Sequence, residues 1–215
     1  MKILFAALCF LSASAVADEI LTDVPAEISS DTRYVFYLHG QIIENEGLRP
    51  THPRWGLYDY PLILETLAED GITVISERRP KGTDRVEYSR KIIGQVQHLL
   101  EAGVLPSHVT VMGFSAGGMI TITASDIAND QDINFVTMAA CSGWLNSASE
   151  LTLNGTVLSV FETTDGPQSC GDLAARSPGP TSFDEIEINT GKEHGAFYLP
   201  RDEWVEPVLA WVRSR

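Results

Sequence analysis

Ten residues near the middle of the chain, 109–118, constrain the fold more than any other stretch. A run of β-branched residues leads there into Gly-Phe-Ser-Ala-Gly, and a segment able to form a helix follows. On so sharp a strand-to-helix turn, Ser115 has its hydroxyl exposed above the sheet, while Gly113 and Gly117 leave room for the tight backbone. The N-terminus of the following helix favours developing negative charge. The pattern predicts a strand, a tight turn bearing a nucleophilic serine, and a helix.

The rest of the chain alternates strand and helix patterns around this unit. Near-continuous apolar runs, typical of strands buried on both faces of a parallel sheet, occupy residues 33–38, 72–75, 109–112, 133–138 and 156–161. Segments with helical spacing or helix signals occupy 59–71, 84–103 and 116–128. We therefore predict an α/β fold, with a mostly parallel sheet of about six strands and helices on both faces. Functional residues of such folds gather at the carboxyl ends of the strands.

Two segments near the C-terminus complete the predicted fold. At 183–188, Glu185 and Glu187 alternate with isoleucines, which is typical of an edge strand with one face in water. The last helix carries Trp204 and Trp211 on one side, spaced to pack on the sheet. Pro207 lies within this helix and implies a kink or a late start.

Two stretches lack regular patterning. Residues 18–32 are polar and contain a proline, which favours an irregular N-terminal extension. Residues 41–58 form a long loop, and a long loop inside a compact domain is more often functional than idle. Four side chains at or near such loops, His39, Trp55, Tyr58 and Trp144, are candidates to line a substrate pocket. The alternative for the three aromatic residues is packing against the sheet edge.

The first seventeen residues have the pattern of a cleaved signal peptide. Lys2 precedes a short apolar run, and Ala15-Val16-Ala17 supplies a cleavage site. We therefore expect residues 18–215 to form one domain, exported to the periplasm or secreted. The full chain has a net charge of −14, and loss of Lys2 would make it one unit more negative. So acidic a protein is expected to repel nucleic acid and anionic membranes, and no membrane insertion is expected after cleavage.

Cleavage would remove Cys9 and leave two cysteines, Cys141 and Cys170. An even pair in an exported protein favours one disulfide, and the alternative is two free thiols. The bond is also favoured because both residues follow strands that we predict to be neighbours, 133–138 and 156–161.

A serine nucleophile needs an adjacent base, and His194 is the best candidate. It lies in a flexible stretch, Gly191-Lys192-Glu193-His194-Gly195, just after the last predicted strand. By contrast, His98 falls on a helix and His108 just before a strand, so a structural role is expected for both. His52 falls on the long loop, where substrate contact or simple solvation are the two interpretations.

The base in turn needs a carboxylate that holds its tautomer. The loop after residues 156–161 reads Glu-Thr-Thr-Asp-Gly-Pro, and we select Asp165 from it. Glu162 at the strand end and Asp172 further along are alternatives, and a surface carboxylate in a turn is the simpler interpretation of any one of the three.

The order Ser115, Asp165, His194 resembles that of the α/β-hydrolase superfamily. The Gly-Phe-Ser-Ala-Gly turn after a strand and His39-Gly40 after the first strand also match its pattern. The resemblance implies a three-layer α/β-hydrolase-like fold and an oxyanion hole formed by the backbone N–H groups of Ala116 and Gln41. The superfamily's two N-terminal strands are not recognisable here, and no insertion is large enough for a helical cap, so we expect an open site.

Other chemistries find little support in the sequence. It has no nucleotide-binding glycine loop and no paired His or Cys motif for a metal, so we expect no cofactor. Arg78 and Arg79 lie in a charged loop, where contact with an anionic substrate and solvation are the two interpretations.

The sequence thus predicts a small serine hydrolase that cleaves an ester bond of a small or medium acyl substrate through an acyl-enzyme. A peptidase or thioesterase on the same triad is one alternative. A non-catalytic binding protein with the same fold is another.

Overall fold

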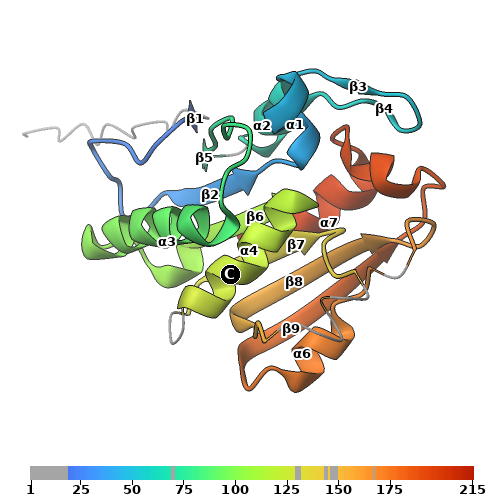
Figure 1. The fold of residues 1–215 in the computed structure, drawn as a ribbon. Helices are drawn as coiled ribbons and strands as arrows, with labels where there is room; N and C mark the ends of the chain where they lie inside the picture. Colours follow the sequence, from blue (N-terminus) through green and yellow to red (C-terminus); the bar gives the residue numbers. More distant parts are fainter. Residues whose placement is uncertain (1–18, 69–70, 129–131, 143–144, 146–149, 167) are drawn as a thin grey trace, which may run out of the picture.

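The computed structural model describes residues 19–68, 71–128, 132–142, 145, 150–166 and 168–215. The predicted signal peptide and Trp144 lie outside these residues. Seven strands form one sheet in the order β1-β5-β2-β6-β7-β8-β9, and every pairing in it is parallel (Figure 1). The strands are β1 (Glu19–Leu21), β2 (Arg33–Leu38), β5 (Ile72–Ile75), β6 (Val109–Phe114), β7 (Asn134–Met138), β8 (Asn154–Glu162) and β9 (Gly179–Ile188). The predicted α/β class is confirmed.

The sheet has one strand more than predicted, and the additional strand is β1. It lies in the stretch that we expected to be irregular, and its three residues pair with β5, Ile20 opposite Val74. So short a strand carries no periodicity, and Ile20 is 43% exposed. The sheet of about six strands is thus confirmed with one addition, which has no local signal in the sequence.

Helices cover both faces of the sheet, as predicted (Figure 1). On one face lie α3 (Arg85–Glu101), α4 (Ala116–Ala128) and the short α6 (Gly171–Arg176); on the other lie α2 (Tyr60–Leu67) and α7 (Asp202–Arg213). Side chains of a strand point alternately to its two faces. In β2, Val35 and Tyr37 accordingly join the core beneath α2 and α7, while Tyr34 and Phe36 join the core beneath α3 and α4.

The helices begin where the sequence indicates. The Asp59 side chain accepts a hydrogen bond from Leu62 N at the start of α2, and Asp84 accepts one from Glu87 N at the start of α3. The last helix, α7, begins at Asp202 and contains Pro207, so it does not start late. Among the described residues, no helix is both long and apolar enough to cross a membrane.

The stretch 41–58 is more ordered than predicted. It contains the six-residue helix α1 (Gln41–Glu46) and a hairpin of two antiparallel strands, β3 (Thr51–His52) and β4 (Gly56–Leu57). The hairpin projects away from the sheet (Figure 1). Elements of two to six residues are too short for hydrophobic periodicity to predict them.

The predicted disulfide is present. Cys141 follows β7 and Cys170 immediately precedes α6, with 5.1 Å between their Cα atoms. Strands β7 and β8 are neighbours in the sheet, as the prediction required. The bond ties the loop at the end of β7 to the segment between β8 and β9.

Strand β9 is the last of the sheet and the longest, with ten residues. Asp184, Glu185 and Glu187 are exposed on it, whereas Ile186 is half-buried and Ile188 is buried. The predicted edge strand is therefore correct in place and character, although it begins four residues earlier, at Gly179.

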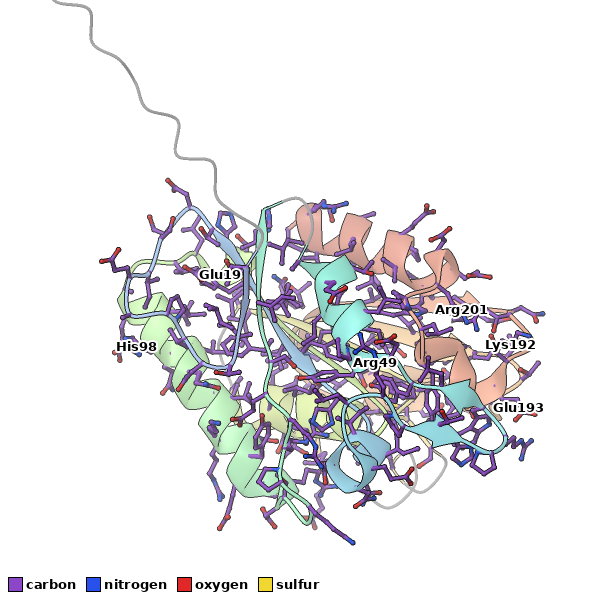
Figure 2. The ribbon with its side chains drawn as sticks, turned by 90° about the horizontal axis from the view of Figure 1, so that it is seen from above. Glu19, Arg49, His98, Lys192, Glu193 and Arg201 are labelled. Carbon is purple, nitrogen blue, oxygen red and sulfur yellow. A yellow bond between two sulfur atoms is a disulfide. The ribbon has the colours of Figure 1, made fainter. Side chains whose placement is uncertain are left out.

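Two short 3-10 helices complete the described structure. One, η1 (Pro106–His108), precedes β6, and the other, η2 (Glu193–Phe197), follows β9. His108 therefore lies at the far end of β6 from Ser115. His98 is exposed on α3 and lies on the opposite side of the molecule from Glu193 (Figure 2).

Candidate active site

Ser115 occupies the single position between β6 and α4. Its φ angle is 55°, in the left-handed region that non-glycine residues rarely adopt. The backbone on both sides of it is held, because Ser115 N–H donates to Met138 O at 2.9 Å and Met119 N–H donates to Ser115 O at 2.9 Å. Such local strain persists only where the surrounding structure imposes it, and it is typical of a nucleophilic serine on this kind of turn.

Gly113 and Gly117 make the turn possible by having no side chain. A Cβ atom on Gly113 would lie 2.2 Å from the carbonyl oxygen of Gly117. A Cβ atom on Gly117 would lie 1.8 Å from the carbonyl oxygen of Leu38, in the adjacent strand β2. Both separations are far below contact distance and involve backbone, so neither position can hold any other residue unless the backbone moves.

His194 and Asp165 are in direct contact. The Nδ1 atom of His194 lies 2.6 Å from Oδ2 of Asp165. Asp165 belongs to the loop after β8, and His194 to η2 after β9, so the carboxyl ends of neighbouring strands bring them together. A carboxylate on Nδ1 fixes the imidazole tautomer and leaves Nε2 as the proton acceptor. Ser115 and His194 line the same pocket.

Glu162 does not contact His194, and its carboxylate is committed elsewhere. It is fully buried and accepts hydrogen bonds from Thr190 N and Thr190 Oγ1, both at 2.7 Å, and from Thr164 Oγ1 at 3.0 Å and Thr164 N at 3.2 Å. Burial acts to raise its pKa, but the hydrogen bonds from Thr190 and Thr164 outweigh it, so the pKa is lowered. Asp172, the other alternative, lies in the first turn of α6.

The Glu162 carboxylate connects the two loops that carry Asp165 and His194. Thr164 immediately precedes Asp165, and Thr190 leads into the loop before His194. The two loops also contact each other directly, since Glu193 N–H donates to Thr164 Oγ1 at 3.2 Å. The sequence did not indicate this role of Glu162, because it depends on residues 28 positions apart.

The two expected oxyanion donors are the first residues of helices. Gln41 begins α1 and lines the pocket, and Ala116 begins α4 immediately after Ser115. The N–H groups of the first residues of a helix have no partner within it, so they are available to a ligand.

The pocket that contains Ser115 has a volume of about 340 Å³. Helix α1 and the β3–β4 hairpin supply most of its wall, including Gln41, Asn45, Glu46, His52 and Trp55. The predicted lining by Trp55 fits this pocket. The imidazole of His52 also lines the pocket and stacks on Trp55, with 4.1 Å between ring centroids.

Trp55 and Glu193 join the hairpin to the loop that carries His194. The Trp55 ring lies 5.0 Å from the His194 ring, and its Nε1–H donates to Glu193 Oε2 at 3.2 Å. Arg54 forms an ion pair with the same carboxylate at 2.7 Å. These hairpin contacts were not predicted, since nothing in residues 51–57 indicates a partner some 140 positions away.

His39 and Tyr58 do not line the pocket, so two pocket predictions were wrong. Both are completely buried. Tyr58 lies beneath the pocket, where its hydroxyl contacts Tyr37 Oη at 3.1 Å and accepts from Gly40 N–H at 3.2 Å. His39 at the end of β2 accepts a hydrogen bond from Arg79 N–H on Nε2 at 2.9 Å.

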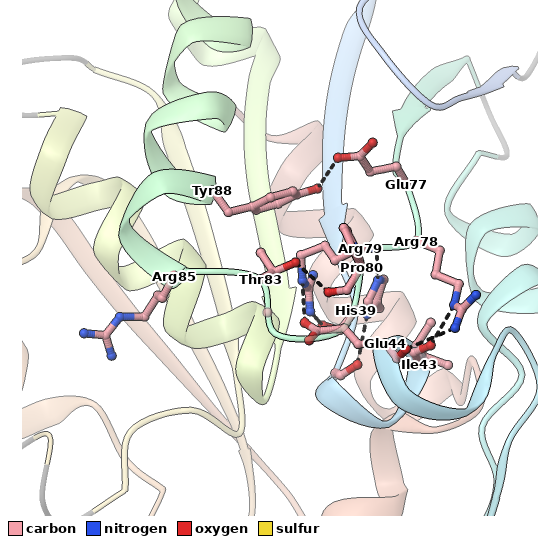
Figure 3. A network of polar contacts seen from close by, with 12 residues as sticks. His39, Ile43, Glu44, Glu77, Arg78, Arg79, Pro80, Thr83, Arg85 and Tyr88 are labelled. Carbon is pink, nitrogen blue, oxygen red and sulfur yellow. Dashed lines mark hydrogen bonds and ion pairs between the residues drawn. The ribbon is translucent and has the colours of Figure 1, made fainter.

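Arg79 is buried and Arg78 is exposed, and both bind the segment after β2 (Figure 3). Arg78 donates to the carbonyl oxygens of Ile43 and Glu44, each at 3.0 Å. Arg79 is fully buried and forms an ion pair with Glu44 at 2.9 Å. Neither arginine lines the pocket that contains Ser115. Glu44 carried no signal in the sequence.

Among the described residues, no three His, Cys, Asp or Glu side chains gather closely enough to ligate a metal ion.

One protein family and many solved structures of similar fold match this chain. Residues 74–163, which include the Ser115 turn, match the phospholipase/carboxylesterase family. No curated protein matches the chain. Similar structures include a serine hydrolase without a lid from Xanthomonas campestris, 14% identical, with a TM-score of 0.52, covering 89% of this chain and 84% of that one.

Two further structures are similar over comparable lengths. One is an arylesterase, 15% identical, with a TM-score of 0.56, covering 89% of this chain and 78% of that one. The other is a hydrolase from Thermoplasma acidophilum, 17% identical, with a TM-score of 0.54, covering 88% of this chain and 90% of that one. At these identities the likeness concerns the fold.

Proposed function

We propose that this chain is a serine esterase of the α/β-hydrolase superfamily, because residues 74–163 match the phospholipase/carboxylesterase family and the fold is similar to that of a serine hydrolase. Its substrate is an ester with a small or medium acyl group, and its catalytic triad is Ser115, His194 and Asp165. The observation that carries the proposal is the 2.6 Å contact between His194 Nδ1 and Asp165 Oδ2 beside a pocket that also contains Ser115.

The reaction proceeds in two steps. Ser115 Oγ attacks the ester carbonyl carbon while His194 Nε2 takes the hydroxyl proton. The resulting oxyanion accepts hydrogen bonds from the N–H groups of Ala116 and Gln41. When the intermediate collapses, the bond to the alcohol breaks and the imidazolium gives its proton to the leaving oxygen. Water then attacks the acyl-enzyme with His194 again as the base, which releases the acid and restores Ser115.

Asp165 stabilises the imidazolium that forms in both steps. Its carboxylate accepts the Nδ1 proton, so the ring keeps Nε2 directed to the reaction rather than turning it away. The Phe114 ring, 4.7 Å from the imidazole between centroids, and the Trp55 ring, at 5.0 Å, pack against it and restrict its movement. Held in this way, the imidazole can serve both half-reactions without a change of tautomer.

The size and lining of the pocket support a compact ester substrate. A volume of about 340 Å³ is at the lower end of the range of small-molecule sites. Its wall combines the aromatic surfaces of Trp55 and Tyr198 with the polar side chains of Gln41, Asn45 and Glu46. We therefore infer that acetyl to butyryl esters are cleaved faster than long-chain acyl esters.

A fluorophosphonate probe tests the nucleophile. We expect wild-type protein to be labelled covalently and Ser115→Ala not to be labelled. The matched control is Ser214→Ala, which removes an exposed hydroxyl beyond the end of α7 and should label like wild type. Absence of label on folded wild-type protein, or equal labelling of Ser115→Ala, would refute the proposal.

A substrate panel separates esterase activity from its alternatives. p-Nitrophenyl esters of increasing acyl length, a matched thioester series and peptide anilides should rank esters first by kcat/KM. A higher kcat/KM for thioesters would indicate a thioesterase with the same triad, and a higher kcat/KM for anilides would indicate a peptidase. Folded protein that binds esters without turning them over would favour the non-catalytic alternative.

Export is proposed from the N-terminal pattern and the disulfide together. Disulfides persist in oxidising compartments, and Cys141–Cys170 is such a bond. The test is expression of the full chain followed by fractionation and N-terminal sequencing. We expect protein outside the cytoplasm that begins at Asp18, with no free thiol under denaturing conditions, whereas uncleaved cytoplasmic protein would contradict the proposal.

A further inference from the structure

The direction of the Gln41 N–H is fixed through the peptide unit to which it belongs. That unit is planar, so its other end, the carbonyl of Gly40, sets where the N–H points. The Gly40 carbonyl oxygen is held by two donors, His39 Nδ1–H at 2.9 Å and Ile43 N–H at 3.2 Å. His39 therefore acts on the proposed oxyanion donor without touching the pocket.

His39 can do this in only one tautomer, and Arg79 selects it. To donate to Gly40, the proton must be on Nδ1, and Nε2 must accept. The backbone N–H of Arg79 donates to Nε2 at 2.9 Å, which requires Nε2 to be unprotonated. Burial, and then the nearby Arg79 guanidinium, lower the pKa of His39 to about 3, so the ring stays neutral at physiological pH.

The Arg79 side chain holds the chain on both sides of this peptide (Figure 3). Its Nη2 donates to the carbonyl oxygen of His39, and its Nε forms the ion pair with Glu44 at 2.9 Å. His39 precedes the Gly40–Gln41 peptide, and Glu44 lies three residues after Gln41 on α1. The guanidinium also lies over the Tyr88 ring of α3, 5.6 Å from its centroid, which anchors it to the body of the fold.

We propose that Arg79 and Glu44 are a positioning pair for the oxyanion hole, holding the Gly40–Gln41 peptide so that Gln41 N–H points into the pocket. This inference rests on the proposed esterase function. A buried ion pair is weak support for stability, because apolar residues of similar volume often replace both partners without loss, whereas removing one partner leaves an unpaired buried charge. Replacing both partners together can therefore restore stability without restoring the position of the peptide, which distinguishes a positioning role from a purely structural one.

The test compares Arg79→Met, Glu44→Met and the double variant with wild type. Each single variant should lower Tm, and the double variant should have a higher Tm than either, because it leaves no unpaired buried charge and lacks only the hydrogen bond to the His39 carbonyl oxygen. Because misplacement of a donor by about 1 Å can cost about 10²-fold in rate, we expect kcat of the double variant to stay roughly 10- to 100-fold low, with KM nearly unchanged. The control is Arg49→Met, which breaks an exposed ion pair with Asp59 and should leave kcat unchanged.

Two further measurements test whether the loss of kcat comes from the oxyanion hole. A phenylboronic acid, which forms a tetrahedral adduct on the serine, should bind the double variant more weakly by about the factor lost in kcat. Active-site counting with a fluorophosphonate corrects kcat for any misfolded fraction. A double variant that recovers kcat together with Tm would overturn the positioning role, as would undiminished boronate affinity.

Failure of the esterase proposal would be visible separately. If wild-type protein neither hydrolyses esters nor reacts with the fluorophosphonate, that proposal fails by itself. The positioning of residues 40–46 is then judged by amide hydrogen exchange, which we expect to be faster there in the double variant than in wild type, with α3 unchanged. Equal exchange over 40–46 in the two proteins would overturn the inference whatever the activity.

Discussion

Replacing Glu162 with Gln tests whether one buried carboxylate holds the Asp165 and His194 loops together. Glutamine keeps the shape and one carbonyl oxygen, but it places an NH₂ group against at least one present donor. The NH₂ group faces either Thr190 or Thr164. The hydroxyl of that threonine can rotate and accept instead, whereas its backbone N–H cannot. The substitution therefore removes one charge-assisted backbone hydrogen bond and leaves its donor buried.

The expected cost follows from that single lost bond. Hydrogen bonds to charged groups contribute about 1.5–3 kcal/mol, so we expect a loss of about 2 kcal/mol of unfolding free energy. For a domain of this size, about 2–4 °C of Tm accompanies each kcal/mol, which gives a decrease of roughly 4–8 °C at pH 7. We expect kcat to fall by no more than about 10-fold, because the Asp165–His194 contact itself remains.

The pH dependence has a definite sign. The hydrogen bonds from Thr190 and Thr164 lower the folded-state pKa of Glu162 against the opposing effect of burial. A carboxylate with a lowered folded pKa stabilises the protein above its unfolded pKa of about 4.3, and this contribution is lost as the pH falls through the folded pKa. The Tm of Glu162→Gln should thus lie below that of wild type by the whole of roughly 4–8 °C at pH 7, and this difference should become smaller below about pH 4.

Thermal unfolding by circular dichroism between pH 3 and pH 8 measures this difference. Glu187→Gln, on the exposed side of β9, is the matched control and should change Tm little at any pH. Equal Tm for wild type and Glu162→Gln at pH 7 would refute the reasoning, and so would a difference that persists unchanged at pH 3. A kcat loss of about 10⁴-fold without a Tm change would instead make Glu162 the catalytic acid.

Three other predictions address the triad, the disulfide and the turn. Asp165→Asn should lower kcat for p-nitrophenyl acetate by about 10⁴-fold with little change in Tm, and a loss below tenfold would exclude it as the triad acid. Reduction of Cys141–Cys170, separated by 29 positions, should lower the unfolding free energy in urea by about 3–4 kcal/mol, and an unchanged midpoint would contradict this. Gly117→Ala should yield no soluble folded protein, because its Cβ would meet Leu38 O at 1.8 Å; a folded variant with wild-type activity would be inconsistent with the turn described.

The elements that the sequence predicted are those with local signals. Buried strands reveal themselves by apolar runs, helices by spacing and caps, and the Ser115 turn by its two glycines. The three proposed catalytic residues could be selected because each follows a strand, and parallel strands bring their carboxyl ends to one edge. Asp165 and Glu162 are only three positions apart, at and just after the end of β8, so their different environments follow from the fold and not from the local sequence.

The contacts that the sequence did not predict join residues distant along the chain. His39 lies beside the long loop and is predicted to line a pocket, yet its ring is buried and accepts a hydrogen bond from Arg79 N–H, 40 positions later. The Arg54–Glu193 pair spans nearly 140 positions. Polar pairs of this kind leave no periodic pattern, because any surface loop can contain the same residue types. Strand β1 and helix α1 were not predicted for a different reason, because three to six residues are too few to show a hydrophobic period.

The acidic side chains of β9 affect whether two copies of this protein can pair through the edge of the sheet. As the last strand of the sheet, it leaves a row of backbone groups with no neighbouring strand of that sheet, which makes it a template on which a second chain could add. Its exposed Asp184, Glu185 and Glu187 put negative charge along that border, so two copies approaching edge to edge repel each other. The strand that supports the His194 loop is therefore also expected to disfavour edge-to-edge pairing of two copies through its own side chains.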